Sequence, residues 1–186
     1  MEYQLAHGDI TDNALFGIDA GCGGACPAGL YKLSLDFPEI MAAGIAYSPI
    51  KPLTVSFDIK HIKWSDTLTT LDISGPNGIS LNLPAGWDDQ TIYALGVEYM
   101  VNERLNIRAG YNKGDSPIDA EDVGNNLILP GVVEEHLAFG ADWRLSRYWD
   151  LGFHLSRAFS NTLTASDGSR IGLDITTFGI NLGYRF

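Results

Sequence analysis

LDITTFGINLGYRF, the stretch from Leu173 to Phe186, alternates between two kinds of side chain. Its even positions from 176 onward are mostly apolar or aromatic, whereas its odd positions from 177 to 185 are small or polar. Because successive side chains of a β-strand point to opposite faces, this pattern predicts a strand with one apolar face. A soluble β-sandwich buries such a face in its core, and a transmembrane β-barrel turns it towards lipid. Tyr184 and the terminal Phe186 favour the barrel, because aromatic residues gather where a barrel wall meets the membrane surface.

The same alternation recurs along the chain, which predicts an all-β, antiparallel transmembrane β-barrel of about eight strands. The further strands are expected at Leu53–Trp64, Thr91–Val101, Leu105–Asn112, Leu137–Leu145 and Trp149–Ser156, with a short pattern also at 1–9. Gly29–Ser48 is expected to form one long strand with an irregularity at Pro38, because proline cannot donate to a strand ladder. In the predicted register, the odd residues of Leu137–Leu145 and the even residues of 176–186 face outward.

Long and short connections alternate between these strands, as the loops and turns of an outer-membrane barrel do. The long connection from Ser65 to Gln90 contains its own strand-like pieces, which predict a hairpin that projects beyond the membrane. Tyr47, Tyr99, Trp143, Trp149 and Tyr184 lie near the short turns, where an aromatic girdle is expected. We therefore expect localisation in the bacterial outer membrane.

Length and composition limit the possible classes of protein. The 186 residues fit one domain, residues 1–186, and the formal net charge of -11 argues against binding to nucleic acid. The longest apolar run, Ile40–Tyr47, is far shorter than the ~20 residues of a spanning helix. The start, Met1-Glu2-Tyr3-Gln4, lacks the basic and apolar regions of a signal peptide, so we expect an N-terminally truncated barrel segment. If the segment closes on itself, Glu2–Ala6 is expected to pair with the terminal strand.

Two features of the predicted loops have alternative interpretations. Acidic residues cluster between the strands, and they are interpreted either as solvated loops or as loops that meet divalent cations at a lipopolysaccharide surface. Cys22 and Cys26 lie in a glycine-rich loop, where they are expected to be free or to form a small disulfide with each other rather than to bind a metal. A zinc site would need two more ligands, and none lies nearby.

The sequence contains no catalytic motif and no histidine spacing typical of a metal site, so we predict no enzyme activity, no metal and no cofactor. The candidate ligand-binding residues are those with lumen parity that suit a greasy substrate or its carboxylate: Lys60, Ile62, Trp64, Ile92, Met100 and Arg108. Apolar side chains inside a barrel suit a hydrophobic substrate, although they could equally pack against a plug. Lys60 and Arg108 are interpreted either as members of an inner ion-pair network or as partners of a fatty-acid carboxylate.

An ordered set of short motifs resembles the FadL-type (OmpP1/FadL/TodX) transporters of long-chain fatty acids and hydrocarbons. The motifs are Leu33–Glu39 (LSLDFPE), Lys63–Ser65 (KWS), Gly86–Asp89 (GWDD), Arg108–Tyr111 (RAGY), Asp115–Pro117 (DSP) and Gly183–Phe186 (GYRF). The resemblance covers nearly the whole chain and corresponds to the C-terminal portion of that family. It implies a fourteen-stranded barrel with an N-terminal hatch and a lateral opening, both upstream of these residues.

The resemblance implies passive transport of long-chain fatty acids or related hydrophobic compounds across the outer membrane. The implied partners are hydrophobic small molecules, outer-membrane lipid and lipopolysaccharide. A structural or adhesive eight-stranded outer-membrane barrel with acidic working loops is the alternative, followed by a soluble lipid-binding barrel. An upstream hatch and signal peptide would distinguish the transporter from the first alternative.

Overall fold

The computed structural model describes residues 2–7, 29–126 and 129–186, so Cys22 and Cys26 lie outside the described residues. Within these ranges, strands are accompanied by three short 3-10 helices: η2 (Trp64–Asp66), η3 (Pro76–Gly78) and η4 (Ala120–Asn125). No helix in these ranges is long and apolar enough to cross a membrane. The predicted all-β, antiparallel class is confirmed.

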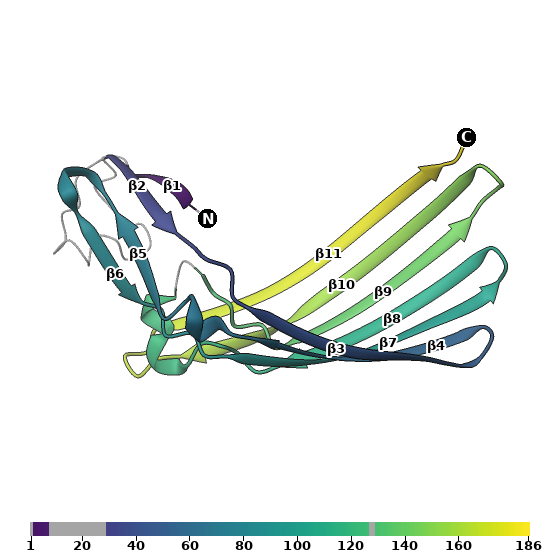
Figure 1. Ribbon diagram of the computed structural model, residues 1–186, viewed down its shortest axis with the longest axis horizontal. Coiled ribbons are helices and arrows are strands. Elements are labelled where there is room, and N and C mark those ends of the chain that lie inside the picture. Colours follow the sequence, from purple (N-terminus) through teal and green to yellow (C-terminus); the bar gives the residue numbers. More distant parts are fainter. Residues whose placement is uncertain (1, 8–28, 127–128) are drawn as a thin grey trace.

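Seven of the described strands form one antiparallel sheet in the order β11-β10-β9-β8-β7-β4-β3. Their bounds are β3 (Ile40–Ile50), β4 (Leu53–Ile62), β7 (Gln90–Asn102), β8 (Leu105–Gly114), β9 (Glu135–Arg144), β10 (Trp149–Thr164) and β11 (Arg170–Tyr184). Figure 1 shows this sheet as a long curved wall. Among the described residues, β3 and β11 are its two edges, so the sheet is open and has one strand fewer than the sequence predicted.

Short turns join β3 to β4, β7 to β8 and β9 to β10, and these turns lie at the same end of the wall as the C-terminus (Figure 1). The β4–β7 and β8–β9 connections and the second sheet lie at the opposite end, as the alternation of connection lengths predicted. The connection between β10 and β11, which was expected to be long, is the short turn 165–169 at that end. Aromatic side chains gather at the turn end, where the Trp149 and Tyr184 rings are 4.8 Å apart and the Tyr148 and Tyr184 rings 6.2 Å. Their position confirms the expected aromatic girdle at this end.

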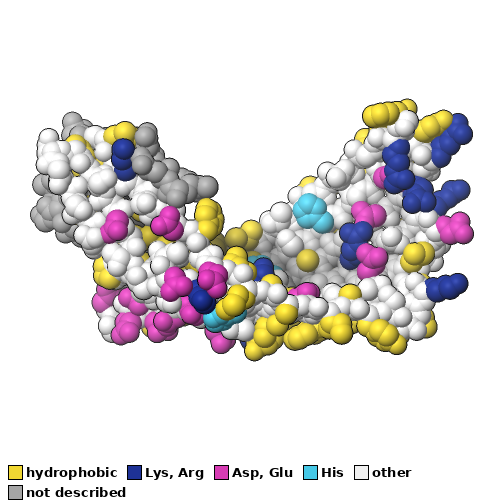
Figure 2. All heavy atoms as spheres, viewed as in Figure 1, with side chains coloured by type: hydrophobic (Ala, Val, Ile, Leu, Met, Phe, Trp, Pro, Cys, Tyr) yellow, Lys and Arg dark blue, Asp and Glu magenta, His cyan; other side chains and the backbone are white. Residues whose placement is uncertain are grey.

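The pairing of the strands confirms the predicted register. Phe139 lies opposite Leu155, which lies opposite Phe178, so all three share a face, and Phe139 and Phe178 are 49% and 63% exposed. Gly140 lies opposite Arg108 and His154 on the other face. Figure 2 shows charged and histidine side chains inside the hollow of the wall and hydrophobic ones along its lower contour. We call the hollow side the inner face and the apolar side the outer face.

The second sheet has four strands in the order β1-β2-β5-β6: β1 (Glu2–His7), β2 (Gly29–Ser34), β5 (Thr70–Ser74) and β6 (Ser80–Pro84). β5 and β6 form the projecting hairpin that the sequence predicted, with the turn η3 at its tip. Asn77 adopts a φ of 58° in this turn, a conformation that asparagine tolerates better than most residues. The sheet belongs to the loop end of the molecule.

Two expectations about the N-terminal region are wrong. Gly29–Ser48 is not one strand, because β2 ends at Ser34 in the small sheet and β3 begins at Ile40 in the wall. The chain changes sheets around Pro38, whose missing N–H interrupts the ladder. Residues 2–7 pair with β2 rather than with the terminal strand, so they do not close the wall.

A hydrophobic core joins the two sheets at the loop end. It contains buried residues from the small sheet, the connections and the wall: Tyr31, Leu33, Leu68, Leu71, Ile73, Leu81, Ala85, Trp87, Ile118, Val123, Val132 and Ile171. Ile171 of β11 belongs to this cluster, and Leu163 of β10 packs against it. The long β10–β11 hairpin therefore continues beyond the wall and supports the loops.

Candidate functional site

Small side chains cover the middle of the inner face. One row of cross-strand neighbours runs through Ala46, Ser56, Gly96, Gly110, Ala138, Ser156 and Thr177. None of these side chains extends far from the sheet, so the centre of the wall is smooth. Larger polar and apolar groups lie towards the two ends.

At the turn end, the inner face carries a network of ion pairs. Arg108 Nε donates to Glu98 Oε2 at 2.7 Å, and its Nη2 pairs with Asp142. Asp150 accepts from Arg185 Nη2 at 2.7 Å and lies 3.9 Å from Arg144 Nε. These groups border a polar depression of about 390 Å³. The Arg108 guanidinium is therefore engaged by two carboxylates from the flanking strands, as an internal network requires.

At the loop end of the inner face, Lys60 has a different environment. Lys60 lies opposite Ala42 on one neighbouring strand and Ile92 on the other, and Ile92 lies opposite Gly114. Its side chain is exposed and has no ion-pair partner in the described part of the chain. Lys60 is thus a cation among small and apolar neighbours, which suits an amphiphile with one anionic group.

Two motifs meet just beyond Lys60. The Trp64 and Trp87 rings contact edge to face with centroids 5.0 Å apart, and Ser65 donates its N–H and its hydroxyl to Asp89 Oδ1 at 3.1 and 2.7 Å. The two bonds from Ser65 lower the pKa of the Asp89 carboxyl because they stabilise its charged form. The Trp64 indole N–H is buried without a hydrogen-bond partner in the described structure. Ile62, which is 7% exposed, ends β4 beside this junction.

A buried asparagine holds the junction from the loop side. Asn126 Oδ1 accepts from Trp87 Nε1 at 2.6 Å, and its Nδ2 donates to the carbonyls of Ala85 and Asp122 at 2.6 and 2.9 Å. Asp88 N–H donates to the Pro117 carbonyl at 2.8 Å. The motifs at 63–65, 86–89 and 115–117 therefore converge on one structural unit at the mouth of the wall.

The six sequence-predicted residues do not form one site. Lys60 and Ile92 are direct cross-strand neighbours, and Ile62 follows on the same side of β4. Trp64 lies beyond the strand in η2, where it packs against the loop-end core. Met100 and Arg108 lie near the turns. Met100 is eight residues along β7 from Ile92, a distance of about 27 Å at the rise of a β-strand. The predicted residues therefore fall into two groups. The loop-end group is Lys60, Ile62, Trp64 and Ile92, and the turn-end group is Met100 and Arg108.

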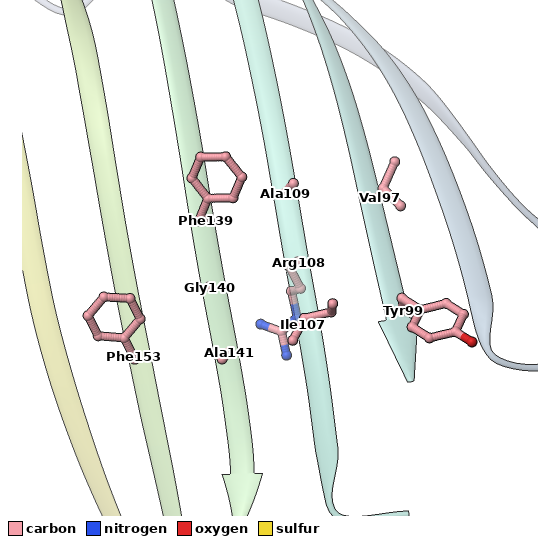
Figure 3. A pocket seen from close by; sticks show the side chains of 9 residues that line it. All are labelled: Val97, Tyr99, Ile107, Arg108, Ala109, Phe139, Gly140, Ala141 and Phe153. Atoms are coloured by element: carbon pink, nitrogen blue, oxygen red, sulfur yellow. The ribbon is translucent and has the colours of Figure 1, made fainter. Parts of the chain in front are cut away.

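The outer face contains an apolar depression of about 400 Å³ that was not predicted from the sequence (Figure 3). The small side chains of Ala109 and Ala141 leave room between larger side chains of β7, β9 and β10, including Tyr99, Phe139 and Phe153. Small residues within an otherwise large apolar face were the available signal. The continuous β8–β9 pairing passes through this region, so the depression is a groove in the surface rather than an opening through the wall.

No group of three or more His, Cys, Asp or Glu side chains within residues 2–7, 29–126 and 129–186 is placed to hold a metal ion. The groups that the described part of the inner face offers are Lys60, an ion-pair network and apolar side chains.

Comparison with solved structures shows a shared fold. The Pseudomonas putida toluene transporter TodX matches with a TM-score of 0.68 at 21% identity, over 85% of this chain and 37% of that chain. The Ralstonia pickettii toluene transporter TbuX matches with a TM-score of 0.62 at 16% identity, over 84% and 36%. A Pseudomonas aeruginosa FadL homologue matches with a TM-score of 0.63 at 16% identity, over 94% and 43%. The chain thus spans less than half the length of these structures.

A search of curated proteins found no match. The sequence model of one family, described as "Outer membrane protein transport protein (OMPP1/FadL/TodX)", matches residues 7–180. The proteins of this family are transport proteins of the bacterial outer membrane rather than enzymes. With nearly the whole chain matched and the curved antiparallel wall in place, this protein belongs to the OMPP1/FadL/TodX family.

Proposed function

We propose that this chain forms part of the wall of an outer-membrane channel through which long-chain fatty acids or related hydrophobic compounds pass without an energy source. Membership of the OMPP1/FadL/TodX family supports transport of hydrophobic compounds. The observation that carries the choice of a fatty acid is Lys60, an inner-face cation that no described carboxylate neutralises. A neutral hydrocarbon would gain nothing from such a charge.

The surroundings of Lys60 support this substrate class. A fatty acid needs a donor for its carboxylate and an apolar surface for its chain, and Lys60 beside Ile92 supplies both. Gly114 lies opposite Ile92 and is buried under it, since a Cβ at position 114 would be 2.8 Å from Ile92 Cγ1. Ile62 and Trp64 border the position from the loop side, and we propose that they contact the chain of the substrate. Charged hydrogen bonds of this kind contribute about 1.5–3 kcal/mol.

We propose that Arg108 does not bind the substrate carboxylate directly. Glu98 and Asp142 already engage its guanidinium, so a substrate carboxylate would have to displace one of them. Met100, one row closer to the turns, is 46% exposed and offers apolar surface without a free charge. We propose that the turn-end group lines the exit of the conduit and that the loop-end group selects the substrate.

The test compares uptake in a host that lacks its own fatty-acid transporter. The protein is this chain joined to the further strands that close its wall, which we call the completed barrel. Lys60→Met should raise the half-saturation concentration for a long-chain fatty acid about tenfold, because one charged contact is lost. Uptake of a neutral aromatic hydrocarbon should not change.

Arg108→Met is the matched control, because it removes a positive charge from the same face. It should affect fatty-acid half-saturation less than Lys60→Met does. Equal effects of the two variants on fatty acid and hydrocarbon would contradict the assignment to Lys60, and absence of uptake by the unaltered completed barrel would contradict transport itself. We also expect the 186-residue chain alone not to restore growth on a long-chain fatty acid.

The ordered small sheet favours a second candidate function, an adhesive or structural barrel. β2, β5 and β6 contribute buried residues to a core at the loop end, so the loops present a defined surface. Failure of uptake together with binding of the completed barrel to a surface ligand would support this alternative.

A further inference from the structure

Among the described residues, the ion pairs on the outer face of the wall lie at its loop end. Three cations and one histidine there each face a carboxylate on a neighbouring strand or its extension. The pairs are Lys63 with Glu39, His61 with Asp89, Lys113 with Glu135 and Arg157 with Asp174. They lie at the β3/β4, β4/β7, β8/β9 and β10/β11 seams, and we call them the outer belt.

The parity of the strands places the outer belt on the face that carries the apolar side chains. Lys113 follows Ile107, Ala109 and Tyr111 at two-residue intervals along β8, and Arg157 follows Phe153 and Leu155 along β10. Lys113 Nζ lies 2.9 Å from Glu135 Oε1, and Arg157 Nη2 lies 3.2 Å from Asp174 Oδ2. Both pairs are about half exposed, so each retains surface for another group.

The turn end has the opposite arrangement. Its ion pairs, centred on Arg108 and Asp150, lie on the inner face, whereas its outer face presents aromatic rings such as Trp149 and Tyr184. The ion pairs therefore lie on the inner face at the turn end and on the outer face at the loop end. A membrane with the same headgroup chemistry in both leaflets does not explain this difference.

We propose that the outer belt binds the phosphorylated sugar headgroup of the glycolipid in the outer leaflet, lipopolysaccharide. Its phosphate groups are suited to the Lys and Arg side chains, and the divalent cations that bridge such phosphates are suited to the carboxylates of the same pairs. Lys113 and Arg157 lie two strands apart and two residues out of line, about 12 Å in total, which is on the scale of a disaccharide. The headgroup thus meets a surface that carries both signs of charge.

Strand pairing alone does not account for the belt. Exposed ion pairs contribute at most about 1 kcal/mol to stability, and the backbone ladders already fix these seams. Charged side chains on the lipid-facing side of a barrel are costly at the midplane and tolerated only near the interfaces. Their concentration at the loop end marks the level of charged headgroups. The inference does not depend on which compound the channel carries.

The test measures retention of deep-rough lipopolysaccharide by the completed barrel in detergent, with size-exclusion chromatography and phosphate analysis. Lys113→Gln combined with Arg157→Gln should lower the retained lipopolysaccharide about tenfold, because two charged contacts to phosphate are removed. Arg147→Gln is the matched control. Arg147 stacks on Tyr148 at the turn end, 4.4 Å from the ring centroid, and its loss should leave retention unchanged.

A second measurement does not depend on the folding of a variant. The unaltered barrel should retain dephosphorylated lipopolysaccharide about tenfold less than the phosphorylated form, and chelation of divalent cations should release part of the bound lipid. Equal retention of the two lipids, or equal retention by the double variant and the Arg147→Gln control, would overturn the proposal.

Discussion

Phe139 and Gly140 are neighbours in the chain that point to opposite faces of β9. Phe139→Arg places a charge on the lipid face, which costs roughly 2–4 kcal/mol near the midplane of the bilayer. Gly140→Ser adds a Cβ 3.4 Å from the Phe153 carbonyl oxygen on the inner face, an ordinary contact. We expect the first variant to lose most of its heat-modifiable folded band on gels and the second to keep it. Equal losses would contradict the assignment of the two faces.

Asp89 gives the loop junction a predictable dependence on pH. The Ser65 bonds lower its folded pKa below the ordinary value of 3.8, so this stabilisation is fully present above that value and is lost as the pH falls through the folded pKa. The contact between Trp64 and Trp87 reports on the junction by fluorescence. Ser65→Ala should therefore shift the acid transition to higher pH, towards the ordinary value. An unchanged transition would show that Asp89 does not control this junction.

The sequence predicted the inner face for Lys60 and Arg108 and offered an ion-pair network as one interpretation of both, which the structure confirms for Arg108 alone. Lys60 and Arg108 share the inner face by parity, which an alternating sequence reveals. Arg108 is neutralised because it lies opposite Gly140, so its guanidinium has space to reach Asp142 in the adjacent row. Such diagonal contacts depend on the register between two strands, and a single strand does not encode that register.

The side-chain amide of Asn126 is buried where the segments 63–65, 86–89 and 115–117 meet, which we call the loop junction. Asn126→Ala leaves the Trp87 indole N–H and the Ala85 carbonyl without their partners, at a cost of about 1–3 kcal/mol. We expect amide hydrogen exchange to increase in 85–89 and 120–126, while β8 keeps its protection. Asn125→Ala, which changes the adjacent and less buried asparagine, serves as the control. Similar exchange in the two variants would contradict the central role of Asn126.

The division of Gly29–Ser48 into β2 and β3 shows that the alternation of side chains does not indicate which sheet a strand joins. Tyr31 and Leu33 have the same parity as Ile45 and Tyr47, so the pattern continues across Pro38. Tyr31 and Leu33 are buried in the loop-end core, whereas Ile45 and Tyr47 are 69% and 68% exposed on the outer face. Burial against protein and burial in lipid require the same alternation. The sequence therefore identified both pieces as strands but assigned β2 to the wall, whereas it belongs to the small sheet.

At the scale of the whole molecule, the described strands of the wall differ in how many of their backbone N–H and C=O groups are hydrogen-bonded. β8 has a ladder on both sides, whereas β3 and β11 each have one partner. In lipid, an unpaired backbone group costs several kcal/mol. When the 186-residue chain is folded into vesicles, we expect β3 and β11 to exchange amide hydrogen much faster than β8, as mass spectrometry would measure. Equal protection of the three strands would show that other backbone covers the edges. Whether the two sheets fold as the predicted single domain stays a prediction.

The number of wall strands has a geometrical consequence. Each of the six pairings in the sheet reverses the direction of the chain, so β3 and β11 run the same way. Bending the wall until its edges touch would create a parallel seam, and so would joining two copies around a common axis. If both edges are to pair with antiparallel neighbours, the number of strands added between β3 and β11 must be odd. The closed barrel then has an even number of strands, as is typical of bacterial barrels. The wall therefore limits which additional strands can complete it.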